Sequence, residues 1–263
     1  MTADEIDFAR LSELDYFFGY EPVATALNVL ADPDETEGHK STHVGKLTDP
    51  IFHQTSTRSG TYGVVPYLEK LVGSQPPAVQ FQIIHLAGWI ALQRGPVPGD
   101  LTEAEWQAYQ QCKPHLAAAA VELFKTMTPK NSVNHQNLLA AIATLSGYHD
   151  DGWRLCHLLE EDKHDCPSCG DSFLSEGLAV PYRKELNHQD YLLDAGGPMY
   201  AYPVHRHVNG VPVTPRTTWP ADHLSTTLFE LAISSNNDTI GQWLANFYGS
   251  ANCPNCGEGI AFA

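Results

Sequence analysis

Two copies of the pentapeptide Cys-Pro-x-Cys-Gly constrain the fold of this chain more than any other feature of its sequence. The first occupies 166–170 (CPSCG) and the second 253–257 (CPNCG), near the end of the chain. In each copy a short turn presents two sulfur atoms to one side, and four thiolates suit a tetrahedral Zn²⁺ ion. We therefore predict one shared structural Zn²⁺ that clamps the C-terminal tail to the middle of the chain. The predicted ligands are Cys166, Cys169, Cys253 and Cys256.

Two other interpretations of the cysteine pairs stay open at this stage. Each pair could form a separate half-site completed by a histidine, for which His157, His164 and His188 are the candidates. The pairs could also be redox-active dithiols, although such a site normally needs a βαβ context that this sequence lacks. The other two cysteines, Cys112 and Cys156, lie in helical patterns and are expected to be small buried side chains.

Disulfides are a weaker interpretation of the even cysteine count. The N-terminus is acidic where a secretory signal would be basic and then apolar, so we expect a cytoplasmic protein. Thiols stay reduced in that compartment, which favours metal binding over a disulfide framework.

Amphipathic helices dominate the pattern of the first 160 residues. Apolar side chains recur at three- and four-residue steps in successive stretches, namely 8–18, 22–31, 64–72, 83–91, 116–127, 138–145 and 155–159. An acidic loop, 32–39, follows the second stretch. Thr102 and Glu105 form a capping box that begins a long helix towards Met127, with Pro114 as the expected point of a kink. Successive helices without a strand signal favour an antiparallel helical stack.

The composition changes near residue 161, where glycine, proline and aromatic residues become frequent. Asn209-Gly210 lies between two valine-rich arms and predicts a β-hairpin over 204–213. Helical spacing returns from Trp219 to Leu231 and, after a break at Asn236-Asn237, from Ile240 to Phe247. We thus expect a mainly α fold in three segments: a helical stack over 1–160, a knuckle and hairpin insert over 161–218, and C-terminal helices with the second knuckle over 219–263.

Parts of the chain resemble bacterial, mostly actinobacterial, HEAT-like helical repeat proteins with two zinc knuckles. The similar stretches are 51–71, with IFHQT at its start and VPYLEKL at its end, and 241–257, with GQWL, FYGSA and CPNCG; the internal CPSCG also fits. The resemblance implies a solenoid-like α-helical fold with zinc knuckles, and it implies no activity. The histidine- and proline-rich stretch 188–220 departs from it. For His53, inside the first similar stretch, we expect packing or capping at a helix junction.

The net charge of the chain limits the kinds of molecule that it is expected to bind. It has 15 Lys and Arg residues against 31 Asp and Glu residues, a net charge of −16. Nucleic acids and anionic membranes require basic patches, so both are unfavourable partners. Our first hypothesis is a zinc-stabilised binding protein, of immunity or scaffold type, whose helical stack engages a basic protein or peptide. The acidic segment 32–37 is a candidate contact, or simply solvated surface.

The alternative hypothesis is a tailoring enzyme of a biosynthetic pathway, acting on a small molecule. His205 and His207 alternate in a predicted strand and so point to one face, and Tyr200 and Tyr202 lie in the same arm. The polar outer face of a hairpin is an equally good explanation of these residues. Together with Arg206 they would line a pocket between the helices and the 188–220 insert and act as acid, base and anion-binding groups. His149-Asp150-Asp151 could bind a cation, although a helix is expected to begin there.

Overall fold

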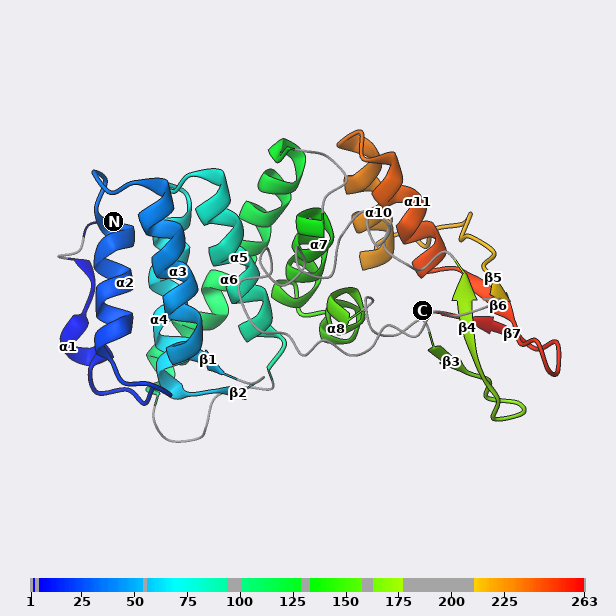
Figure 1. The fold of residues 1–263 in the computed structure, drawn as a ribbon, viewed down its shortest axis with the longest axis horizontal. Helices are drawn as coiled ribbons and strands as arrows, with labels where there is room; N and C mark the ends of the chain where they lie inside the picture. The colour runs from blue at the N-terminus through cyan, green and yellow to red at the C-terminus, as the bar shows by residue number, and fades with distance from the viewer. Residues whose placement is uncertain are drawn as a thin grey trace. The chain divides into compact units, whose positions relative to one another are not determined.

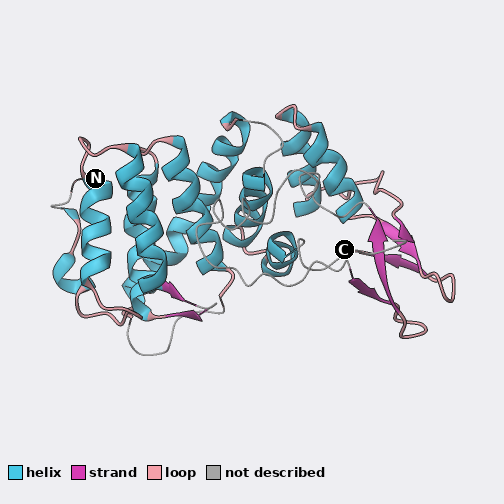
Figure 2. Ribbon diagram, viewed as in Figure 1, coloured by secondary structure: helices cyan, strands magenta, loops and turns pink. Residues whose placement is uncertain are grey.

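Residues 2, 5–53, 56–93, 101–128, 133–157, 163–176 and 211–262 are described by the computed structural model. Over these residues the chain is mainly helical with a few short strands, as Figures 1 and 2 show, and this confirms the predicted fold class. The chain divides into two compact units, one of residues 1–127 and 137–153 and one of residues 128–136 and 154–263. The division into three segments stays a prediction. Among the described helices, none combines the length and the apolar character that a membrane span requires.

The first unit is a stack of helices (Figure 1). Neighbouring helices pack in pairs: α2 on α3, α3 on α5, α4 on α6, and α5 on both α4 and α6. The unit consists of α1 (Phe8–Leu11), α2 (Glu21–Ala31), α3 (Glu37–Ile51), β1 (Phe52–His53), β2 (Ser56–Thr57), α4 (Ser59–Val72), α5 (Pro77–Ala91), α6 (Glu103–Thr126), most of α7 (Val133–Leu145) and the start of α8 (His149–His157).

The core of this unit consists of the predicted apolar stripes. Helix α2 buries Val23, Ala26, Leu27 and Leu30, which the 3.6-residue period of a helix brings to one face. Helix α4 buries its predicted stripe from Val64 to Val72 in the same way. Each buried Leu or Val side chain contributes roughly 1.5–3 kcal/mol to folding, so these stripes hold the stack together.

Helix α6 begins with the predicted capping box. The hydroxyl of Thr102 accepts a hydrogen bond from the N–H of Glu105, while the Glu105 carboxylate accepts one from the N–H of Thr102. The helix then runs without interruption from Glu103 to Thr126, so Pro114 does not divide it.

Helix α3 is the main element that the apolar pattern does not predict. The expected acidic loop 32–39 ends early, because Thr36 caps a helix that starts at Glu37. Few large apolar residues mark this helix, and its buried face is completed by Lys40 and His43. A long alkyl stem and an imidazole ring can cover apolar neighbours, although neither counts as apolar in a sequence pattern.

The second unit combines helices with small sheets. Helix α10 packs on α11, and the break between them is Asn236, whose φ of 55° lies in the left-handed region that asparagine tolerates. The remaining elements are the end of α8, β3 (Lys163–Asp165), β4 (Ser172–Glu176), β5 (Val211–Pro212), α10 (Leu224–Ser234), α11 (Asp238–Phe247), β6 (Ser250–Asn252) and β7 (Gly259–Ala261).

The predicted hairpin over 204–213 is only partly within the described residues. Its second arm is strand β5, which pairs in parallel with β4, Ser175 lying opposite Val211. Its first arm, with His205 and His207, lies outside the described residues.

Candidate metal centre

The first knuckle lies at the tip of a β-hairpin. Strands β3 and β4 pair antiparallel, with Asp165 opposite Ser172, and the pentapeptide forms the connection between them. The N–H of Cys166 donates to the carbonyl of Asp171 at 2.8 Å, and the N–H of Gly170 donates to the carbonyl of Cys166 at 2.9 Å. These two bonds close the turn and bring Cys166 and Cys169 to one side of it.

The second knuckle repeats this geometry. Strands β6 and β7 pair antiparallel around it. The N–H of Cys253 donates to the carbonyl of Glu258 at 2.8 Å, and the N–H of Gly257 donates to the carbonyl of Cys253 at 2.9 Å. The two knuckles thus form the same structure at two places in the chain.

Glycine after the second cysteine is required by the backbone in both knuckles. Gly170 has a φ of 76° and Gly257 a φ of 75°. In this left-handed region a side chain would be strained, whereas glycine adopts it readily. The repeated Cys-Gly ending of the motif therefore has a conformational reason.

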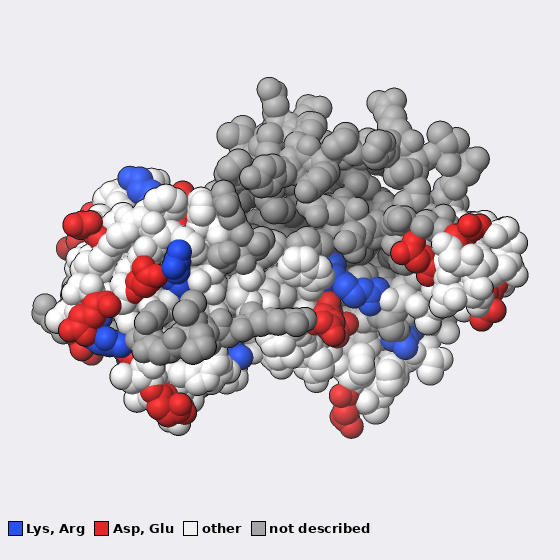
Figure 3. All heavy atoms as spheres, turned by 90° about the horizontal axis from the view of Figure 1, so that it is seen from below, with Lys and Arg blue, Asp and Glu red and all other residues white. Residues whose placement is uncertain are grey.

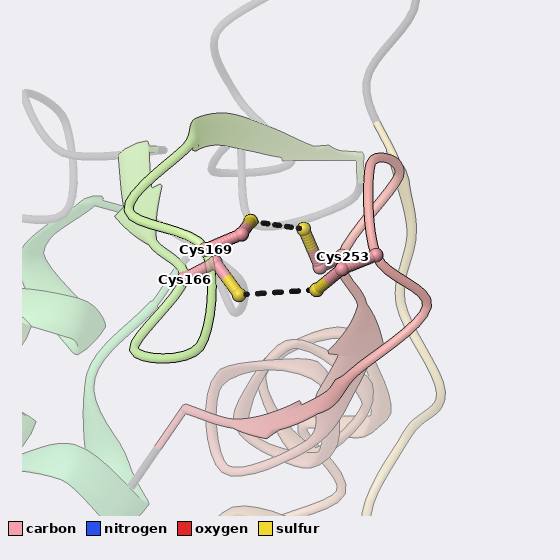
Figure 4. Close-up of side chains that lie close together, drawn as sticks. Cys166, Cys169 and Cys253 are labelled. Atoms are coloured by element: carbon pink, nitrogen blue, oxygen red, sulfur yellow. Dashed lines mark hydrogen bonds between the residues drawn. The ribbon is translucent and has the colours of Figure 1, made fainter.

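The two knuckles face each other and bring four sulfur atoms together (Figure 4). The Sγ atoms of Cys166 and Cys256 are 3.6 Å apart, and those of Cys169 and Cys253 are 3.7 Å apart. All four Sγ atoms lie within 4.8 Å of one another. Four bonds of about 2.3 Å to one tetrahedral ion would place the sulfur atoms about 3.8 Å apart. The cluster therefore has the dimensions of a four-thiolate metal site, and its cysteines form no disulfide.

The protonation of the sulfur atoms also favours a bound cation. Backbone N–H groups of Cys256 and Asn255 point at the Cys253 sulfur and lower the pKa of this thiol to about 7. For Cys256, the N–H of Glu258 acts to lower the pKa, but burial and the neighbouring sulfurs outweigh it and raise the pKa to about 12. Several thiolates at this distance repel one another, so full ionisation requires a positive ion among them.

Short strands hold the two hairpins beside each other within the second unit. Strand β5 pairs with β4 of the first hairpin. Just after β5, Thr214 exchanges two backbone hydrogen bonds with Ser250 at the start of the second hairpin, at 2.7 and 3.0 Å. A Cβ atom on Gly249 would collide with the carbonyl oxygens of Thr214 and Asn246, so only glycine permits this close approach.

Histidines are not needed to complete the cluster. The group that could hold a metal ion among the described residues consists of the four cysteines. Of the histidines considered for separate half-sites, His188 lies outside the described residues, and His157 and His164 are described in their backbone only. The single shared site is therefore the arrangement that the geometry supports.

Of the two other cysteines, Cys112 is buried as expected and Cys156 is half-buried. The Cys112 thiol donates to the carbonyl of Tyr109 at 3.1 Å, and burial raises its pKa to about 12. Burial raises the pKa of Cys156 to about 12 as well. Both thiols stay protonated near neutral pH, so neither is an activated nucleophile.

The candidate residues of the enzyme hypothesis lie outside the described residues. These are Tyr200, Tyr202, His205, Arg206 and His207. The segment His149-Asp150-Asp151 forms the first turn of α8.

His53 packs against two aromatic rings, with centroids 5.7 Å from Phe17 and 5.0 Å from Phe18. Packing is therefore the role that the structure gives to His53.

One hollow in the first unit was not anticipated from the sequence. Its lining includes Trp106, Tyr109, Gln110 and Lys113, which form one stripe along α6. Aromatic residues at this spacing are typical of a buried helix face, so the sequence pattern alone predicts core rather than pocket.

Comparisons with protein-family models, with curated proteins and with solved structures found no match to this chain. The resemblance to HEAT-like repeat proteins therefore stays a prediction. The interpretation of the site rests on its geometry and chemistry.

Proposed function

We propose that the chain is a zinc-stabilised helical binding protein that engages a basic protein or peptide. The observation that carries the structural part of this proposal is the cluster of four protein thiols at tetrahedral spacing. A site with four protein ligands leaves no open position for a substrate or a water molecule, which is typical of structural rather than catalytic zinc.

Zn²⁺ is the ion that we assign to this cluster. Tetrahedral thiolate sites take zinc or iron. The four-cysteine set has no open position, and the described residues contain no βαβ unit, so a metal with no redox role is favoured. Reduced thiols also require a reducing compartment, so a cytoplasmic location is part of the proposal.

Metal analysis of the purified protein tests this assignment. We expect about one zinc ion per chain in the wild type and none in the Cys253→Ser/Cys256→Ser variant, because two ligands cannot retain the ion. The Cys156→Ala variant, which loses a thiol outside the cluster, should keep its zinc. Stoichiometric iron with a visible thiolate-to-iron absorption would overturn the assignment, and so would a metal-free wild type.

A concentration of negative charge at the N-terminal end of the chain supports the binding part of the proposal. The first 50 residues hold 11 of the 31 acidic residues but 3 of the 15 basic ones, a net charge of −8, which is half of the −16 of the whole chain. Between α2 and α3, Asp32, Asp34 and Glu37 are exposed. Asp32 also lies at the C-terminal end of α2, where the helix dipole adds further negative potential.

The face of the molecule drawn in Figure 3 offers little to an anionic partner. On the face drawn in Figure 3, acidic side chains are spread over the described surface, and the basic ones are interspersed without forming a continuous patch. A basic partner would be attracted from a distance, with an affinity that falls as salt rises.

A labelled nona-lysine peptide, followed by fluorescence anisotropy, tests where this attraction is strongest. We expect Asp32→Asn/Asp34→Asn/Glu37→Gln to weaken its binding by about threefold to tenfold at low salt, with the difference shrinking as salt rises. The matched control is Asp222→Asn/Glu230→Gln/Glu258→Gln, which removes three exposed carboxylates from the second unit. Equal losses in both variants would contradict a basic-partner site between α2 and α3.

A further inference from the structure

The first unit contains a half-open cavity that the proposed function does not use. Its volume is about 700 Å³, within the range of about 300–1,000 Å³ that is common for small-molecule sites. Its walls are α4, the end of α5, one face of α6, and the turn that leads into α8. All of these residues belong to the first unit.

Three aromatic rings form the apolar wall of this cavity. Tyr62 from α4 and Trp106 and Tyr109 from α6 contact one another, with ring centroids 5.7, 4.9 and 5.3 Å apart. The Tyr62 hydroxyl is 2.9 Å from the Thr57 hydroxyl, which fixes its ring. Tyr62 and Tyr109 are buried and hold the half-buried Trp106 ring in place before a ligand arrives, so a flat apolar group could lie against Trp106 at low entropic cost.

The cavity also contains an ammonium group that pairs with no carboxylate in the described part of the chain. Lys113 lies over the Tyr109 ring at 5.6 Å, and burial lowers its pKa. It forms no ion pair with any described residue, although the chain has twice as many acidic residues as basic ones. A partly desolvated cation in such a place gains most from an anionic group that enters with a ligand.

Negative charge lies on another side of the same cavity. Asp150 and Asp151 line it from the first turn of α8. Asp150 forms no ion pair with Lys113, so the positive and the negative group stay separate across the hollow. A ligand with one charge would satisfy one side and be repelled by the other.

We propose that this cavity binds a small zwitterion with an aromatic group, of the class of the aromatic α-amino acids. The carboxylate of the ligand pairs with Lys113, its ammonium group lies towards Asp150, and its ring packs on Trp106. This site is independent of the metal centre, which belongs to the second unit.

Isothermal titration calorimetry with matched ligands tests the proposal. The probes are L-phenylalanine, its amide, which lacks the carboxylate, and N-acetyl-L-phenylalanine, which lacks the ammonium group. We expect the free amino acid to bind and each derivative to bind about tenfold more weakly or worse, because each leaves one charge of the cavity unpaired. No binding of L-phenylalanine up to about 10 mM would overturn the proposal, since this exceeds the range of a specific small-ligand site.

Variants of the cavity residues test whether L-phenylalanine binds in this cavity. Lys113→Met should weaken the binding of L-phenylalanine about tenfold and should not weaken that of the amide, whose ammonium group is no longer repelled, so that the preference for the free amino acid is lost. Lys125→Met is the control on the same helix, because Lys125 is exposed and pairs with Glu122 outside the cavity. Asp150→Asn alters only an exposed side chain. It should abolish the preference of the protein for L-phenylalanine over N-acetyl-L-phenylalanine. Unchanged preferences in both folded variants would show that the amino acid binds elsewhere.

Discussion

Glu105 connects two elements of the first unit through a single carboxylate. It caps α6 through Thr102 and also receives two hydrogen bonds from the guanidinium of Arg10 in α1, at 2.6 and 2.9 Å. The Arg10 hydrogen bonds, and then those of Thr102, lower the pKa of Glu105 from its ordinary 4.5 to about 2. A carboxylate that is held this way contributes stability only while it is ionised.

Replacement of Glu105 by glutamine should therefore destabilise the protein in a pH-dependent manner. Near pH 7 we expect Glu105→Gln to lower the free energy of unfolding by about 1–2 kcal/mol, a value reduced for the partial exposure of the pair. The folded-state pKa is depressed, so the contribution is complete above about pH 4.5 and is lost as the pH falls towards 2. Urea unfolding of both proteins at a series of pH values measures the difference.

Glu122 provides the control for this prediction. It lies on the same helix and pairs with Lys125 at 2.7 Å, but both side chains are well exposed. Glu122→Gln should change the free energy of unfolding by less than about 0.5 kcal/mol at any pH. If Glu105→Gln had no larger effect than this control, the capping and clamping role of Glu105 would be wrong.

At the scale of elements, the spacing of apolar residues was sufficient to predict the helices that have a continuous apolar stripe. It predicts α2, α4 and α11, whose buried residues include Leu27, Leu68 and Trp243. It does not predict α3, because Lys40 and His43 complete the buried face of that helix. A pattern of residue types cannot show which polar side chains will be covered by neighbouring helices.

The strands around the knuckles could not be predicted from propensity. Strands β3, β6 and β7 are three residues long and β4 is five, and each exists because the knuckle turn brings its two flanks together. The turns themselves follow from the motif, since the glycine that ends each knuckle permits the left-handed backbone. The same motif also made the four cysteines of the site predictable. The cavity beside Lys113 could not be predicted, because no sequence motif marks it.

At the scale of the whole molecule, the two units depend on different sources of stability. The first unit buries continuous apolar stripes between its helices. In the second unit, the two knuckle hairpins are joined by strand β5, by the bonds between Thr214 and Ser250, and by the sulfur cluster. Sheets this small are marginal in water without a further cross-link, so the metal should contribute a large part of their stability.

Removal of the metal should therefore act on one unit and spare the other. After treatment with a strong zinc chelator, we expect amide hydrogen exchange to become at least about tenfold faster in 163–176 and 250–262, because the hairpins lose their cross-link. The amides of α2 and α4 should keep their protection. The same treatment of the Cys253→Ser/Cys256→Ser variant should cause no further change, which excludes a direct effect of the chelator. Unchanged exchange in the hairpins of the wild type would mean that strand pairing alone holds them, and equal acceleration in α2 and α4 would mean that the two units unfold together.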